Sequence, residues 1–163
     1  DNVIFADESA TASFALLSTM ARARPHTPLP LTGGSIGQGL PLAVGAAIAA
    51  PDRKVICPHG DGGAAYTMQA LWTMAREKRD VVIVIYANRS YAILNIELGR
   101  VGATGSGPVA MSMLDLHNPE MNWTRIGEGL GVESSRATTC EEFAAQYSSA
   151  LKHRGPRLIE AMI

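Results

Sequence analysis

Short apolar runs alternate with longer segments of helical spacing along most of the chain. The runs that we predict to be strands are residues 2–6, 55–57, 81–86, 132–136 and 158–163. Nearly continuous apolar runs are typical of strands that are buried on both faces. The predicted helices lie between them, at residues 40–50, 91–98, 123–130 and 140–153, with one more ending before Pro25 and one helix-length segment preceding residue 81. This alternation predicts a doubly wound, mainly parallel α/β sheet flanked by helices.

Three stretches break the alternation. Pro25, Pro28 and Pro30 predict an extended connection after the first helix. Residues 31–39 are rich in glycine and are predicted to form a loop. Residues 99–119 form a long irregular segment, and a segment of that length inside a compact domain is often a functional lid.

Composition narrows the class of protein. The 163 residues suit one domain, predicted to span residues 1–163 without a linker. No apolar run approaches the ~18 residues of a membrane span. The net charge of −1, with evenly spread Lys and Arg, argues against a nucleic acid partner. Cys57 lies in a predicted buried strand, so two reduced thiols, Cys57 and Cys140, in a cytoplasmic protein are expected.

Polar residues of metal-binding type follow two of the predicted strands. The run at residues 55–57 is followed by Gly60, Asp61, Gly62 and Gly63. The run at residues 81–86 is followed by Asn88 and Ser90. In a strand–helix–strand crossover both strands end at the same edge of the sheet, and ligands bind along that edge. Asp61 and Asn88 are therefore expected side by side.

The chemistry of these residues predicts a magnesium diphosphate site. Mg²⁺ prefers about six oxygens, usually from one or two carboxylates together with substrate phosphates. The Asp61 carboxylate, the Asn88 amide and the Ser90 carbonyl would leave positions for a diphosphate, which the glycine turn could receive on its backbone N–H groups. The alternative is that Gly60-Asp61-Gly62 is a plain turn and Asn88 a cap. Their joint occurrence after successive strands favours the metal site.

These residues resemble the thiamine diphosphate signature of the decarboxylase and acetohydroxyacid synthase group of enzymes. The resemblance rests on Gly60-Asp61-Gly62 followed by Asn88, and on the upstream glycine-rich loop that leads into Leu40 and Pro41. It extends from Glu8 to Glu160, essentially the whole chain. It implies the pyrophosphate-binding domain of such an enzyme.

The resemblance implies a role for each part of the signature. Asp61, Asn88 and the Ser90 carbonyl would hold Mg²⁺. The diphosphate would be received by the turn of Gly60, Gly62 and Gly63 and by the N–H groups near Tyr91.

It also implies residues that face the rest of the cofactor. Ile36 would be the apolar wedge that bends thiamine diphosphate, and the Gly34 carbonyl would accept a hydrogen bond from its 4′-amino group. Ser9 and Thr11 are candidates for phosphate contacts, with plain helix capping as the alternative.

One departure from the family pattern concerns the substrate. Simple pyruvate decarboxylases place a Glu where this chain has Leu94. This argues against a pyruvate decarboxylase and leaves benzoylformate-decarboxylase-like and acetolactate-synthase-like enzymes. Leu94 and Glu97 are expected to face the substrate, although a packing Leu and a solvated Glu are the alternatives.

The resemblance predicts a benzoylformate-decarboxylase-like decarboxylase or carboligase acting on 2-oxo acids, with an acetolactate-synthase-like transferase as the alternative. A non-catalytic nucleotide-binding or regulatory subunit on the same scaffold is the rival. In the family the activating Glu belongs to a separate pyrimidine-binding domain, so no catalytic residue is assigned here. The chain is predicted to be the C-terminal part of a larger enzyme or one subunit of a split enzyme, to form a homodimer or homotetramer, and to be inactive alone.

Overall fold

Six parallel strands form the sheet, in the order β2-β1-β3-β4-β6-β5. The computed structural model describes residues 2–103 and 107–163. The strands are β1 (Val3–Asp7), β2 (His26–Pro30), β3 (Val55–Gly60), β4 (Val81–Ala87), β5 (Glu133–Ala137) and β6 (Arg157–Met162). The predicted doubly wound parallel sheet is confirmed, with β3 and β4 as neighbours at its centre.

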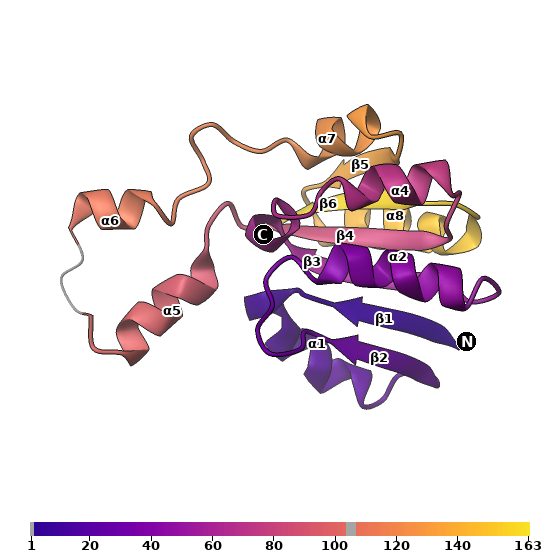
Figure 1. Cartoon of the computed structure of the whole chain (residues 1–163), viewed down its shortest axis with the longest axis horizontal. Coiled ribbons are helices and arrows are strands. Elements are labelled where there is room, and N and C mark those ends of the chain that lie inside the picture. Colours follow the sequence, from indigo (N-terminus) through magenta and orange to yellow (C-terminus); the bar gives the residue numbers. More distant parts are fainter. Residues whose placement is uncertain (1, 104–106) are drawn as a thin grey trace.

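Helices cover both faces of this sheet (Figure 1). The front face in that view carries α2 (Gly39–Ala49), α4 (Ala70–Arg76) and α7 (Trp123–Gly129). Behind the sheet lie α1 (Ser13–Met20), which follows the 3₁₀ turn η1 (Ala10–Ala12), and α8 (Cys140–Lys152). Along β4 the side chains alternate between two cores: Val81 and Ile83 face one, Val82 and Val84 the other. This alternation explains why the strand reads as a continuous apolar run.

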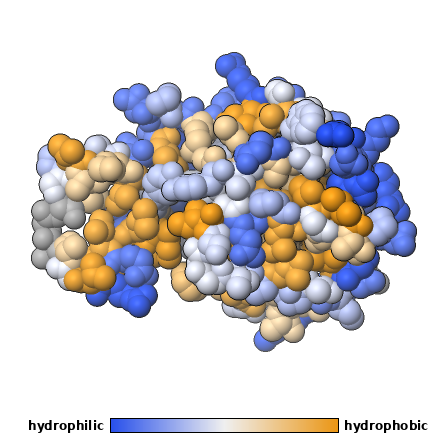
Figure 2. Space-filling model, viewed as in Figure 1, coloured by the Kyte–Doolittle hydropathy of each residue, from blue (hydrophilic) through white to orange (hydrophobic). Residues whose placement is uncertain are grey.

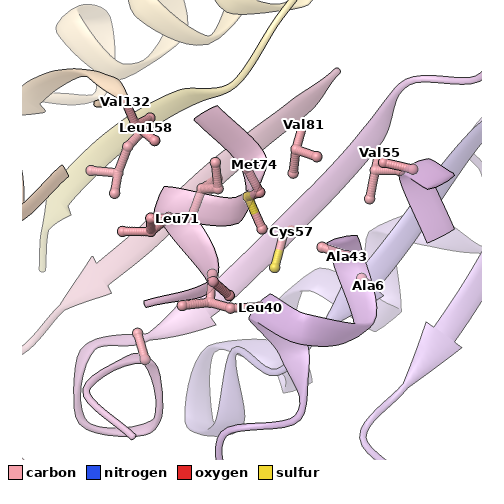
Figure 3. Packing of buried hydrophobic residues seen from close by; sticks show 14 of the residues in the cluster. Ala6, Leu40, Ala43, Val55, Cys57, Leu71, Met74, Val81, Val132 and Leu158 are labelled. Atoms are coloured by element: carbon pink, nitrogen blue, oxygen red, sulfur yellow. The ribbon is translucent and has the colours of Figure 1, made fainter. Parts of the chain in front are cut away.

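The larger core lies between the sheet and the front helices. Leu40 and Ala43 of α2 and Leu71 and Met74 of α4 pack there around Cys57 of β3 (Figure 3). Both cysteines are free, with Cys57 buried and Cys140 exposed. Burial raises the pKa of the Cys57 thiol, so this residue acts as a small apolar core side chain.

Two predictions about local structure were wrong. The segment holding Pro25, Pro28 and Pro30 is more than a connection, since it contains β2, an edge strand paired to β1 alone. Proline is compatible with an edge strand, where the missing N–H can face away from the sheet.

The segment between β3 and β4 is not one helix. It forms α3 (Asp61–Ala64) and α4, separated by turns. The turns keep the chain coiled through bonds from Tyr66 N–H to the Gly63 carbonyl (3.2 Å) and from Thr67 N–H to the Ala64 carbonyl (3.2 Å). In this interrupted segment the hydroxyl of Thr67 bonds to the glycine-rich loop before α2.

A projecting arm, of which the structure describes residues 92–103 and 107–113, stands beside the sheet at the edge where the strands end (Figure 1). It contains α5 (Ala92–Arg100), close to the helix predicted at residues 91–98, and α6 (Pro108–Ser112), within the segment predicted as irregular. Residues 104–106 of that segment lie outside the described residues. Apolar side chains are exposed along the arm (Figure 2), among them Ile96, Val101, Val109 and Met113. Within residues 2–103 and 107–163, no helix is both long and apolar enough to cross a membrane.

Candidate functional site

One hollow at the edge where the strands end brings together most of the predicted site residues. Those lining it include Ser9, Thr11, Gly60, Asp61, Gly62, Gly63, Asn88, Ser90 and Tyr91. They come from the ends of β1, β3 and β4, which are neighbours in the sheet. The other lining residues, which the sequence did not single out, are Ala10, Ala12, Tyr86, Ala92, Ile93 and Ile163.

Asp61 links the two central strand ends. It is the first residue of α3, directly after β3, and only 3% of it is exposed. Its Oδ1 accepts from the N–H of Gly62 (2.8 Å), and its Oδ2 accepts from the N–H of Arg89 (2.7 Å). Burial raises the pKa of the Asp61 carboxyl, while the two N–H groups act in the opposite direction. The carboxylate is therefore held in one orientation but lacks the solvation that favours its charge.

The second strand end carries Asn88, Arg89 and Ser90. The side-chain oxygen of Asn88 accepts from the N–H of Ser90 (3.0 Å), which folds the chain into a tight turn. Arg89 occupies the left-handed region with φ of 54°. This turn directs the Arg89 N–H to Asp61, so that both predicted metal-binding segments share one hydrogen-bonded frame.

The glycine turn packs closely against Tyr91. A Cβ on Gly62 would lie 2.5 Å from the Tyr91 ring, so only glycine fits there without movement. The Tyr91 N–H donates to the Leu114 carbonyl (2.9 Å). Ala92 and Ile93 line the hollow at the start of α5, where the first N–H groups of a helix have no partner within it. These two N–H groups are the donors near Tyr91 that remain for an anion.

Ser9 and Thr11 both line the hollow, at the end of β1. The Ser9 hydroxyl donates to Asp7 Oδ1 (2.6 Å) and lies 2.9 Å from the Ser13 hydroxyl. Ser9 precedes η1 without capping it through its side chain. Its hydroxyl is therefore engaged by Asp7, whereas Thr11 has a partly exposed position in the hollow.

Gly34 and Ile36 lie on the glycine-rich loop before α2, and neither lines the hollow. Gly33 and Gly34 have positive φ values of 63° and 68°, which explains the need for glycine in this turn. The Ile36 side chain is 50% exposed although it is apolar.

Leu94 and Glu97 lie on α5, also outside the residues that line the hollow. Leu94 is 39% exposed, and Glu97 forms an ion pair with Arg100 (2.9 Å) within the same helix. The structure thus groups Leu94 and Glu97 on the arm and separates them from the turn at Asp61.

Sequence reasoning missed the most buried polar contact near the site. Glu8 (4% exposed) and His59 (0% exposed) lie side by side where β1 and β3 end. Glu8 accepts from the N–H groups of Gly37 (2.6 Å) and Gly39 (2.5 Å). The His59 Nδ1 atom lies 3.0 Å from the Gly60 carbonyl, at hydrogen-bond distance. The argument that pairs Asp61 with Asn88 applies equally to these two residues and would have found them.

The donor set fits a divalent cation that shares its coordination with a phosphate group. Among the described residues, no three His, Cys, Asp or Glu side chains come together as a metal cluster. A cation at Asp61 would therefore need the Asn88 amide oxygen and a main-chain carbonyl, all of them hard oxygen ligands suited to Mg²⁺. Each Asp61 oxygen has one N–H partner and keeps a lone pair for a metal.

Comparisons with known proteins show the family of this chain. Residues 10–161 match the family model described as the thiamine pyrophosphate enzyme C-terminal TPP binding domain. The chain is 49% identical to IlvX of Mycobacterium tuberculosis, which is named after the acetolactate synthase large subunit, covering 100% of this chain and 32% of that protein. It is 34% identical to a benzoylformate decarboxylase of Pseudomonas aeruginosa, covering 98% of this chain and 29% of that protein.

Solved structures show the same fold. A thiamine diphosphate-dependent 4-hydroxybenzoylformate decarboxylase of Rhodococcus jostii RHA1 matches with a TM-score of 0.84 and 34% identity, covering 98% of this chain and 29% of that one. A benzoylformate decarboxylase of Polynucleobacter necessarius matches with a TM-score of 0.86 and 26% identity, covering 100% and 30%. The chain spans about a third of the length of these proteins. Its sequence places it in the thiamine pyrophosphate enzyme family, to which it belongs as a C-terminal TPP-binding domain.

Proposed function

We propose that this domain binds thiamine diphosphate and Mg²⁺ for an enzyme that decarboxylates an aromatic 2-oxo acid of the benzoylformate type. The observation that carries the proposal is the convergence of Asp61, Asn88 and Ser90 on one hollow with the Gly62–Gly63 turn and the start of α5. Oxygen ligands and free N–H groups then face the same space, which suits a metal diphosphate. The relatives named for benzoylformate support the substrate class.

Each residue has a distinct task in this proposal. Asp61, Asn88 and the Ser90 carbonyl would hold Mg²⁺, and the N–H groups of Gly63, Ala92 and Ile93 would bind the diphosphate. The Gly62 N–H instead donates to Asp61 Oδ1, so Gly62 would serve by orienting that carboxylate. Ile36, exposed on a loop outside the hollow, would support the thiamine ring system, and the Gly34 carbonyl would orient it. When bound, the cofactor supplies the nucleophilic carbon and the electron sink for loss of CO₂ from a 2-oxo acid.

We propose that the substrate contacts the arm. Leu94 is apolar and more than a third exposed, as expected for a side chain that contacts an aromatic group once the site is complete. A second candidate, an acetolactate-synthase-like transferase, is favoured by the 49% identity to IlvX. Both activities begin with a 2-oxo acid and would be separated by their products.

We further propose that this domain works with a pyrimidine-binding domain, in the same polypeptide or in a partner subunit. The exposed apolar side chains of the arm and the coverage of about a third of the relatives' length support this. A homodimer or homotetramer in the cytoplasm is part of the same proposal, and two free cysteines agree with that location. Turnover of pyruvate or benzoylformate by this domain alone would contradict it.

Calorimetric titration tests the cofactor site. Thiamine diphosphate should bind in the presence of Mg²⁺ and be lost with a chelator. Asp61→Ala should weaken binding on the order of 100-fold, because the variant removes the only carboxylate among the proposed metal ligands. Asp52→Ala is the matched control, since Asp52 is an exposed carboxylate ahead of β3, at the opposite edge of the sheet. Binding that survives Asp61→Ala unchanged would refute the site and favour a non-catalytic domain on this scaffold.

A further inference from the structure

The glycine-rich loop before α2 is held to the sheet by a buried carboxylate. Glu8 Oε1 accepts from the N–H of Gly37 (2.6 Å), and Glu8 Oε2 accepts from the N–H of Gly39 (2.5 Å). Short hydrogen bonds to an ionised acceptor are the strong ones. Burial acts to raise the pKa of Glu8, but the His59 side chain and the two N–H groups outweigh it and hold that pKa below its ordinary value. The carboxylate is therefore charged while it binds the loop.

His59 supports Glu8 from the neighbouring strand. Its Nε2 lies 3.1 Å from Glu8 Oε2, an ion-pair distance, although the two groups are not aligned as in a regular hydrogen bond. Both groups are buried, so His59 Nε2 packs directly against the Glu8 carboxylate. The other ring nitrogen, Nδ1, lies 3.0 Å from the Gly60 carbonyl, in the turn that leads to Asp61. The Glu8–His59 pair thus touches both the loop and the diphosphate turn.

Two glycines, Gly39 and Gly63, leave room for this pair, and a third, Gly37, leaves room for the segment after α3. A Cβ on Gly39 would lie 2.8 Å from both Glu8 and His59, and a Cβ on Gly63 would lie 2.8 Å from Glu8 Oε1. A Cβ on Gly37 would lie 2.9 Å from Tyr66. The loop and the turn therefore approach the pair as closely as a backbone can.

A second contact holds the loop from the opposite side. The Thr67 hydroxyl donates to the Gly37 carbonyl (2.7 Å). Gly37 is thus fixed at its N–H by Glu8 and at its carbonyl by Thr67, and Ile36 is its direct neighbour. Neither Glu8, His59 nor Thr67 lines the hollow.

We infer that the Glu8–His59 pair is a positioning device: it holds the Gly37 and Gly39 backbone, and with it Ile36, at a fixed place relative to the Asp61 turn. The inference rests on the proposed function, because its consequence is how well this chain accommodates the thiamine ring system. The diphosphate anchor at Asp61 and Asn88 has its own hydrogen bonds and does not depend on the loop.

Two probes separate the loop from the anchor. With Mg²⁺ present, inorganic diphosphate reports on the anchor alone, and thiamine diphosphate reports on the anchor together with the loop. In the complete enzyme, Glu8→Gln should weaken thiamine diphosphate binding about tenfold and inorganic diphosphate binding less than about twofold, since one of the two loop bonds is lost. His59→Phe, which keeps a ring of similar size, should shift the ratio of the two affinities in the same direction.

A direct readout of the loop accompanies the binding data. Amide hydrogen exchange at Gly37 and Gly39 should be faster in Glu8→Gln than in the wild type, because these N–H groups lose an ionised acceptor. Glu160→Gln is the matched control. Glu160 is also fully buried and accepts from Thr124 and Arg136, but it lies away from the loop. This variant should lower stability without changing the ratio of the two affinities.

Thr67→Val keeps the test decisive if Glu8→Gln does not fold. Thr67 is half-buried and uncharged, so the variant removes only the bond to the Gly37 carbonyl and should shift the affinity ratio about threefold. An unchanged ratio in the folded variants, with normal exchange at Gly37, would overturn this inference alone. A wild type that binds neither probe would instead overturn the proposed function.

Discussion

The carboxylate of Asp61 accepts a hydrogen bond from the backbone N–H of Arg89 at 2.7 Å, and this bond joins the turn after β3 to the turn after β4. Arg89 can make it because its backbone adopts a φ of 54°. A side chain in this left-handed region is strained, typically by about 1–2 kcal/mol. The turn is held in place despite the local cost, as is common where a site needs a particular backbone direction.

Two substitutions of Arg89 distinguish the cost of its strained backbone from the effect of losing its side chain. Arg89→Gly should be more stable than Arg89→Ala by about 0.5–1 kcal/mol, because glycine removes the strained Cβ but gains freedom in the unfolded chain. Both variants lose the weak contact between Arg89 and Glu120, which lie 3.9 Å apart with more than a third of each exposed. Urea denaturation measures the difference. Equal stabilities would show that the turn carries no strain.

Two glycine substitutions should have opposite effects. Gly62→Ala would place a Cβ 2.5 Å from the Tyr91 ring, so the ring must move, at a cost of about 1–3 kcal/mol in the free energy of unfolding. Gly45→Ala, in an exposed position inside α2 with open space around it, should stabilise by about 0.5–1 kcal/mol. Thermal unfolding and thiamine diphosphate titration of both variants check this. Only Gly62→Ala should also weaken cofactor binding.

The contribution of the Glu8 carboxylate to stability should depend on pH. Its pKa is held below the ordinary value of 4.5, so its contribution is fully present above that value and is lost as the pH falls through the lowered pKa. The gap in free energy of unfolding between the wild type and Glu8→Gln should therefore be constant near neutral pH and shrink below pH 4.5. Urea titrations at stepped pH values measure this gap. A gap that stays constant into the acid range would contradict the prediction.

Leu94 is expected to affect the substrate and not the cofactor. In the complete enzyme, Leu94→Glu should leave thiamine diphosphate affinity within about twofold and reduce kcat/KM for benzoylformate on the order of tenfold or more, because a carboxylate replaces an apolar contact. Leu94→Met, which conserves volume, is the control and should retain most activity. A Leu94→Glu enzyme with unchanged kinetics would remove Leu94 from the substrate pocket.

The sequence predicted the central strands well because they are buried on both faces. β3 and β4 therefore carry continuous apolar runs, and Asp61 and Asn88 could be placed by where those strands end. β2 was missed because an edge strand with a proline at its centre and another at its end, Pro28 and Pro30, carries no such run.

Long-range contacts account for the other errors. The break between α3 and α4 coincides with the bond from Thr67 to the Gly37 carbonyl, which joins residues far apart in sequence. Glu8 was given no role, because the groups that its carboxylate binds, the N–H groups of Gly37 and Gly39, belong to a loop far from it in sequence. No local pattern distinguishes a carboxylate that caps a helix from one that binds a distant loop.

The arm leaves the sheet and returns to it through a narrow neck. Tyr91 N–H donates to the Leu114 carbonyl, and Leu116 N–H donates to the Arg89 carbonyl, each at 2.9 Å. Because the two ends already meet, lengthening or shortening the segment between them adds little closure entropy, about 0.6 kcal/mol for each doubling of its length. A change in the arm beyond Ile93 can therefore alter what this domain offers a substrate while the turns at Asp61 and Asn88 keep their own hydrogen bonds.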